Sequence, residues 1–180
     1  YESGLMSISS LKQKLQKSKK EGTLPKIIIP VHLAGQSCDM KEIFNLSKEY
    51  GFKIIEDAAE MLGQTYKGKP CGSFGDISTF SFYPNKHVTT GEGGMVVTNN
   101  DQLVEPLRGL RNLGFQSKKR FVHERFGWNL RMTNMQAAVG VAQLEQLDGL
   151  VQRKRQMGAK YNELLKDVEG IQLPLAKTGY

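Results

Sequence analysis

Cysteine is scarce in this chain of 180 residues, which contains only Cys38 and Cys71. The two residues form no Cys-x-x-Cys pair and no other spacing typical of zinc ligands. We therefore expect no metal site. Two unpaired thiols are the simpler interpretation, and they suit a reducing compartment such as the cytoplasm.

Long hydrophobic runs are absent too, since no apolar stretch approaches the roughly 18 residues that a membrane-spanning helix needs. The first residues, Tyr-Glu-Ser-Gly-Leu-Met, lack the basic-then-apolar layout of a secretory signal. We expect no membrane partner. Hydrophobic residues make up 39% of the chain and charged residues 24%, as in globular proteins with a core.

Acidic residues are in the minority, with 18 Asp and Glu against 25 Lys and Arg, so the net charge is +7. Much of the positive charge lies in residues 12–20 and 118–125. A basic balance can indicate a nucleic acid or another phosphate-bearing partner, but also solvated helix faces. No nucleic-acid-binding motif is present and aromatic residues do not alternate with the lysines, so we expect no nucleic-acid partner. A phosphate-rich small substrate also suits the charge.

Strand and helix patterns alternate along the chain. Short β-branched runs predict strands, and apolar residues at helical spacing between capping residues predict helices. The apolar run 26–31 reads as a strand buried on both faces. Such alternation predicts an α/β fold, a three-layer α/β/α arrangement with a mostly parallel sheet. The expected strands are 26–31, 52–56, 77–82 and 95–98; the expected helices are 11–20 (capped by Ser9-Ser10), 40–50 (capped by Asp39 and ended by Gly51), 100–110 and 133–165; residues 114–124 read as an exposed loop and 168–173 as the start of another element.

Ligands of such folds bind beyond the carboxyl ends of the strands. His32, Asp57, Ser81 and Lys86 each lie at or just past a predicted strand end, so these are the residues to examine. A carboxylate at Asp57 can cap a helix, bind a metal or pair with a cationic ring nitrogen.

Lys86 stands between a buried-looking strand and the glycine-rich turn Gly91-Glu-Gly-Gly94. Most lysines are surface charges, and that alternative applies here. A lysine in a partly dry pocket is instead a nucleophilic amine that forms Schiff bases with carbonyls, including that of pyridoxal phosphate.

Several segments in order resemble one family of enzymes. They are Glu56-Asp-Ala-Ala-Glu60, Gly72-Ser-Phe-Gly-Asp76, Phe80-Ser-Phe82, Lys86 with Thr89-Thr-Gly-Glu-Gly-Gly94, and Gly127-Trp-Asn-Leu-Arg-Met-Thr133 with Gln136-Ala-Ala138. Together these segments resemble the DegT/StrS family, fold-type-I enzymes that use pyridoxal 5'-phosphate to transaminate nucleotide-linked keto sugars. The resemblance covers most of residues 27–160.

The resemblance implies roles for individual residues. Lys86 would hold the cofactor as a Schiff base and later move the proton, while Asp57 would keep the pyridine nitrogen protonated. Ser81 would bind the cofactor phosphate. Asn129 resembles the asparagine that reaches the phosphate of a neighbouring subunit's cofactor, which implies a homodimer with a shared active site; a loop-organising amide is the alternative.

Some positions depart from the family pattern or stay open. Glu60 stands where the family often has His or Gln near the cofactor's ring oxygen, and a carboxylate would repel a phenolate unless it is protonated or turned away. His32 either lines the substrate pocket or is a satisfied core histidine. Arg131 either contacts substrate phosphates or forms a structural ion pair. His87 matters because related sugar 3-dehydratases carry histidine in place of the lysine, yet the spacing from Phe80-Ser-Phe82 puts the family lysine at Lys86.

The resemblance also bears on extent and function. Residues 1–160 would be part of the cofactor-binding large domain without its N-terminal portion, and residues 161–180 the start of a truncated C-terminal small domain. The resemblance implies amino transfer from glutamate to a nucleotide-linked 4-keto or otherwise 3-keto 6-deoxy hexose, for polysaccharide synthesis. A 3-dehydratase and a non-catalytic protein that retains the fold are the alternatives.

Overall fold

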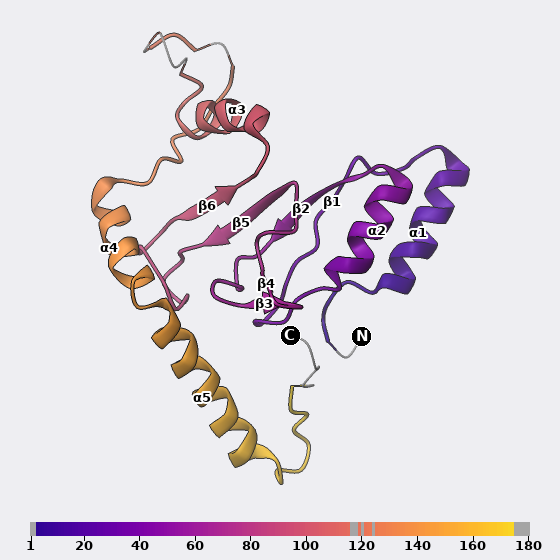
Figure 1. Cartoon of the computed structure of the whole chain (residues 1–180), viewed down its shortest axis with the longest axis vertical. Helices are drawn as coiled ribbons and strands as arrows, with labels where there is room; N and C mark the ends of the chain where they lie inside the picture. Colours follow the sequence, from indigo (N-terminus) through magenta and orange to yellow (C-terminus); the bar gives the residue numbers. More distant parts are fainter. Residues whose placement is uncertain (1–2, 116–118, 120, 124, 175–180) are drawn as a thin grey trace.

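The computed structural model describes residues 3–115, 119, 121–123 and 125–174, and it contains a sheet flanked by helices (Figure 1). The elements in chain order are α1 (Ile8–Glu21), β1 (Ile27–Ile28), α2 (Met40–Tyr50), β2 (Lys53–Asp57), β3 (Thr65–Tyr66), β4 (Lys69–Pro70), β5 (Ile77–Ser81), β6 (Gly94–Val97), α3 (Asp101–Arg111), α4 (Asn134–Leu144) and α5 (Leu147–Leu165).

The main sheet has the strand order β1-β2-β5-β6. β1 pairs parallel with β2 and β2 pairs parallel with β5, whereas β6 runs antiparallel to β5. The helix α2 makes the crossover that a parallel pair requires, while β6 follows β5 without an intervening helix. The predicted α/β class with a mostly parallel sheet is therefore confirmed.

Helices α1 and α2 lie side by side and pack beside β1 and β2 (Figure 1). Their apolar residues Leu15, Met40, Ile43 and Leu46 form the core with strand residues such as Ile54. As predicted, α2 is capped by the Asp39 side chain, which accepts from the Glu42 N–H, and ends at Gly51 with φ 79°.

The start of α1 differs from the prediction. The Ser7 side chain accepts the Ser10 N–H at 3.3 Å, so the helix begins one turn earlier than a cap at Ser9-Ser10 implies. Three serines lie within four residues, and propensity alone does not choose among them.

Only one face of β1 is buried, so the prediction of a strand buried on both faces is wrong for this chain. Ile27, Ile29 and Val31 are each about half exposed, at 50%, 51% and 48%, whereas Ile28 is buried toward the helices. Side chains alternate between faces along a strand, and α1 and α2 cover one of them.

The predicted helix 133–165 is two helices. Thr133 and Gln136 form a capping box that starts α4. A turn at residues 145–146 then interrupts the helix before α5 begins. Residues 168–173 form neither helix nor strand. The hairpin of β3 and β4 was not predicted, because two-residue strands carry no periodicity. Its turn lies at Lys67 and Gly68, which both have positive φ.

No side chain of α5 is buried, and Figure 1 shows the helix extending away from the sheet. The expected domain boundary at residues 160–161 falls within this helix and stays a prediction. Residues 175–180 of the expected second domain lie outside the described residues. None of the helices in the described ranges combines the length and apolar character needed to cross a membrane.

Candidate active site

The carboxyl ends of β2 and β5 lie next to each other. Asp57, the last residue of β2, is in register with Thr79 of β5, and the Ala58 N–H donates to the Thr79 carbonyl at 2.9 Å. Ser81 ends β5 two residues further on. Two of the predicted site residues therefore project from the same edge of the sheet, where parallel α/β folds bind ligands.

Lys86 reaches this edge from the turn after β5. Its N–H donates to the Tyr83 carbonyl at 3.0 Å, and its side chain is 18% exposed. The ammonium Nζ lies 3.3 Å from Oε1 of Glu60, which is three residues past Asp57 in the segment that follows β2. The Lys86 side chain is therefore mostly covered and lies beside the segment that follows β2, whereas most lysines extend from the surface.

Asp57 and Ser81 each have a hydrogen-bonding group available for a ligand. Oδ1 of Asp57 accepts the Ala59 N–H at 3.1 Å, while its other carboxylate oxygen has no hydrogen bond within the described part of the chain. The Ser81 hydroxyl oxygen accepts the Tyr83 N–H at 3.3 Å, and its own O–H is still able to donate. The edge thus offers an amine, a carboxylate and a hydroxyl.

Glu60 contacts two segments at this edge. Its Oε2 accepts the Ala34 N–H at 2.6 Å and its Oε1 pairs with Lys86. The Ala34 hydrogen bond, together with Lys86, holds the pKa of Glu60 below its usual range, although partial burial opposes this. Glu60 is therefore an ionised carboxylate at neutral pH, with one oxygen turned toward the backbone of residue 34.

His32 is 1% exposed, and both of its ring nitrogens have protein partners. Its Nδ1 accepts the Cys38 N–H at 3.1 Å, so the ring proton is on Nε2, which donates to Glu56 Oε1 at 3.0 Å. This geometry favours a satisfied core histidine, the alternative raised above. Contact between His32 and substrate stays a prediction.

Glu56 is a buried residue whose importance the sequence reasoning missed. Its carboxylate, which is 0% exposed, accepts hydrogen bonds from five donors. Burial opposes its ionisation, but the bonds from His32 and from three backbone N–H groups outweigh burial, and the pKa of Glu56 is lowered. The donors are His32 Nε2, the N–H groups of Gly72, Phe74 and Gly75, and the Ser78 hydroxyl.

A signal for Glu56 was present in the sequence. It stands two residues after Ile54, so in a strand it faces the same way as that apolar residue. A carboxylate on a buried strand face must be paired or hydrogen bonded. Through Glu56, the loop of residues 72–75 is fixed to β2 one residue before Asp57.

Gly72 tests how tightly that loop is held. Its φ is 90°, and a Cβ there would lie 2.0 Å from the Phe80 ring. We expect Gly72→Ala to lower the free energy of unfolding by about 3 kcal/mol, since it adds backbone strain and a collision in the interior. Urea unfolding measures the change. Gly158→Ala is the control: it lies in helix α5 with nothing within 4 Å, and it should stabilise by about 0.5–1 kcal/mol. Equal effects at the two sites would contradict this account.

Helix α4 fixes the glycine-rich turn after Lys86. The Gln143 side chain accepts the Thr89 N–H at 3.0 Å and donates to the Thr89 carbonyl at 2.6 Å. Gln136 donates to the Glu92 carbonyl at 3.1 Å. His87 is bonded through Nε2 to the Leu62 carbonyl at 2.8 Å, so it faces the loop after β2. These contacts give both ends of the Lys86 segment a fixed position.

Asn129 and Arg131 lie apart from Lys86. Asn129 forms an antiparallel bridge with Asn112, in a segment that follows the end of α3. No interaction between described residues joins it to Asp57, Ser81 or Lys86. Arg131 is exposed and forms no ion pair within the described ranges. Both of their proposed contacts, with a second subunit's cofactor and with substrate phosphate, stay predictions.

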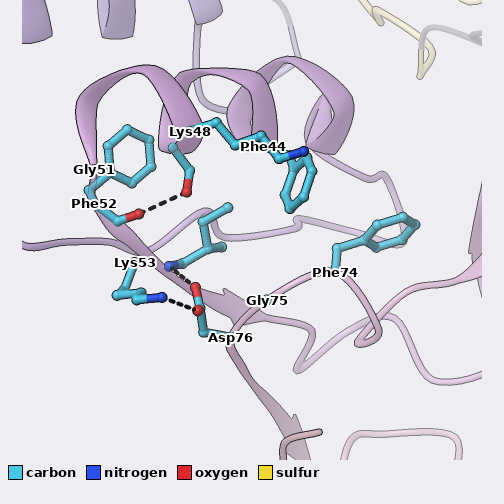
Figure 2. A pocket seen from close by; sticks show the side chains of 10 residues that line it. Phe44, Lys48, Gly51, Phe52, Lys53, Phe74, Gly75 and Asp76 are labelled. Carbon is cyan, nitrogen blue, oxygen red and sulfur yellow. Dashed lines mark hydrogen bonds and ion pairs between the residues drawn. The ribbon is translucent and has the colours of Figure 1, made fainter. Parts of the chain in front are cut away.

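A separate hollow lies at the opposite edge of the sheet. This cavity of about 380 Å³ lies beside the end of α2 and the start of β2. Figure 2 shows the side chains that line it. Asp76, on its wall, already accepts from Lys53 Nζ at 3.0 Å and from the Ile54 N–H at 2.9 Å. Its carboxylate is thus engaged within the protein, and the chemically promising edge is the one that carries Lys86.

A model of the DegT/DnrJ/EryC1/StrS aminotransferase family matches residues 1–178. The chain belongs to this family. The predicted family is therefore confirmed.

Individual members of the DegT/DnrJ/EryC1/StrS family show how close the similarity is. GDP-perosamine synthase of Escherichia coli O157:H7 is 46% identical over 158 residues, which are 88% of this chain and 42% of that protein. UDP-N-acetyl-3-dehydro-alpha-D-glucosamine 3-aminotransferase of Acidithiobacillus ferrooxidans is 42% identical over 86% of this chain and 42% of that protein. A solved family aminotransferase from Brucella abortus superposes with a TM-score of 0.89 at 34% identity, covering 99% of this chain and 48% of that one. The chain thus spans less than half the length of these relatives.

Proposed function

We propose that the protein containing this chain is a pyridoxal-phosphate-dependent aminotransferase that acts on a nucleotide-linked keto-deoxy sugar, with glutamate as amino donor. The observation that carries the proposal is the mostly covered Lys86 side chain near the edge where β2 and β5 end, in a member of an aminotransferase family.

The groups at this edge fit pyridoxal phosphate. The cofactor would supply an electron sink for the substrate's amino-bearing carbon. Lys86 offers the amine that bonds its carbonyl carbon and then moves a proton as a base. The available Asp57 oxygen suits a protonated ring nitrogen, and the Ser81 O–H suits a phosphate oxygen. Asn129 of a second copy would add a further phosphate contact.

Relatives support the substrate class. The two enzymes compared above are named for products or substrates that are nucleotide-linked amino or keto sugars. The positive net charge and the exposed Arg131 suit the diphosphate of such a substrate. We place the reaction at a 4-keto or 3-keto group of a 6-deoxy hexose, in polysaccharide precursor synthesis.

Amino transfer is favoured over the dehydratase alternative by the position of Lys86. The Lys86 amine pairs with Glu60, three residues past β2, while the His87 ring is bonded to the Leu62 carbonyl. A base that moves protons at the bound substrate must lie at this edge. We therefore assign the role to Lys86.

A homodimer in the cytoplasm completes the proposal. Three large apolar side chains near Asn129 are exposed: Phe126 at 75%, Trp128 at 60% and Leu130 at 69%. Exposed apolar residues gathered in one segment favour a protein interface, and a second copy there would bring Asn129 to a shared site. Cys38 and Cys71 are both free and buried, which suits a reducing compartment.

The decisive experiment uses the native gene product that contains this chain. With pyridoxal phosphate it should become coloured, and borohydride should fix the cofactor to the peptide that holds Lys86, as mass spectrometry would show. The loaded protein should then convert nucleotide-linked 4-keto or 3-keto sugars to amino sugars only when an amino donor such as glutamate is present. A fixed adduct elsewhere, or release of water without amino transfer, would contradict the proposal.

A further inference from the structure

Glu60 joins the reactive amine to a distant turn. One carboxylate oxygen pairs with Lys86 Nζ at 3.3 Å, and the other accepts the Ala34 N–H at 2.6 Å. The side chain is therefore held from two sides and has no freedom to rotate without losing one bond. The carboxylate fixes the direction in which the Lys86 side chain points.

The turn that holds Glu60 has a constrained backbone. Ala34 has φ 52° and Gly35 has φ 78°, and Leu33 and Gln36 exchange backbone hydrogen bonds across them. A left-handed alanine is uncommon and persists only where its surroundings hold it. The bond from the Ala34 N–H to Glu60 is one such support.

A second support comes from helix α5. The Gln64 side chain donates to the Gly35 carbonyl at 3.1 Å, and its oxygen accepts from Arg155 Nη2 at 2.9 Å. Gly63, next to Gln64, lies against Val151 and Leu147 of the same helix, so close that a Cβ there would be 2.6 Å from Val151. A continuous set of polar contacts thus runs from Lys86 through Glu60, the 34–35 turn and Gln64 to Arg155, 69 residues further along the chain than Lys86.

We propose that Glu60 is a positioning residue for Lys86, and that Gln64 and Arg155 hold it in place from helix α5. The role is to present the amine at the carboxyl edge before a carbonyl arrives. This positioning role rests on the proposed function, but the contacts of Glu60, Gln64 and Arg155 form without cofactor. Helix α5, which buries no side chain in the sheet, would thereby contribute to the site through one arginine.

The test measures how fast an amine-acylating reagent labels Lys86 in the native gene product before cofactor is added. The reagent must break the pair with Glu60 before it reaches the amine. Glu60→Gln keeps an oxygen for the Ala34 N–H and removes the charge, so it should speed labelling about threefold, the effect expected of one partly exposed ion pair. Arg155→Met should speed labelling in the same direction by a smaller factor.

Glu42→Gln is the matched control, because Lys12 of α1 and Glu42 of α2 form a pair at the same distance of 3.3 Å. It should speed labelling of Lys12 and leave Lys86 unchanged. A Lys86 rate that is unchanged in Glu60→Gln would overturn the positioning role, and an unchanged rate in Arg155→Met would overturn the part of α5. If borohydride fixes no cofactor on Lys86 in any variant while these rates change as stated, the proposed function fails and the positioning of Lys86 stands.

Discussion

Lys86→Ala is expected to lower the rate of amino transfer by about 10³-fold or more. The change removes the amine that bonds the cofactor and the base that moves the proton, and proton transfer by a placed group alone is worth 10²–10⁴-fold. The variant should also lose the borohydride-fixed adduct. Steady-state kinetics with a nucleotide-linked keto sugar and glutamate measure the first effect, and mass spectrometry the second.

Lys69→Ala is the control, since Lys69 is an exposed residue of β4, and its activity should stay within about twofold of the parent because isolated surface changes have small effects. Retention of more than a tenth of the activity in Lys86→Ala would contradict the assignment. Unfolding curves that coincide with those of the parent would show that the loss is chemical and not structural.

Mixing Lys86→Ala subunits with Asn129→Ala subunits tests the shared site. Each hybrid dimer would have one site with both defects and one site with neither. If subunits exchange at random, half the dimers are hybrids, and the mixture should regain up to about a quarter of the parent activity. A mixture no more active than its components would mean that Asn129 serves the site of its own subunit or none.

Part of the candidate site was predictable because strand ends follow from local patterns. The alternation of strands and helices predicted a mostly parallel sheet with ligands at the carboxyl ends of its strands, and the parallel pairing of β2 with β5 places Asp57 and Ser81 on one such edge. Family spacing then selected Lys86 over His87. Neither step needed knowledge of tertiary contacts.

The missed features depend on contacts between segments that are far apart in sequence. Glu60 meets Ala34 across 26 residues and Gln64 meets Arg155 across 91. The role of Glu56 needs five donors, four of which belong to a later loop and strand. The break between α4 and α5 was missed because apolar spacing continues through residues 145–146, and propensity places element boundaries poorly. Periodicity reports which face is apolar, but not which polar groups will meet.

Glu56→Gln is expected to destabilise the fold by about 3–5 kcal/mol. All donors around Glu56 point hydrogens at its two oxygens, and a glutamine would turn an NH₂ group toward at least one of them. Losing the charge and leaving buried donors unpaired costs about that amount. Urea unfolding of the native gene product at pH 7 measures it. Glu163→Gln, an exposed change on α5, should stay within about 0.5 kcal/mol.

The destabilisation by Glu56→Gln should shrink in acid, and this separates a charge effect from a packing effect. Because the folded protein holds the pKa of Glu56 below the ordinary value of 4.5, its charge contributes fully above about pH 4.5 and is lost as pH falls through the folded pKa. The glutamine does not titrate. The gap in unfolding free energy between parent and variant should therefore be largest near pH 7 and narrow below pH 4.5. A gap that stays constant down to pH 3 would mean that shape, and not the carboxylate charge, holds the 72–75 loop to β2.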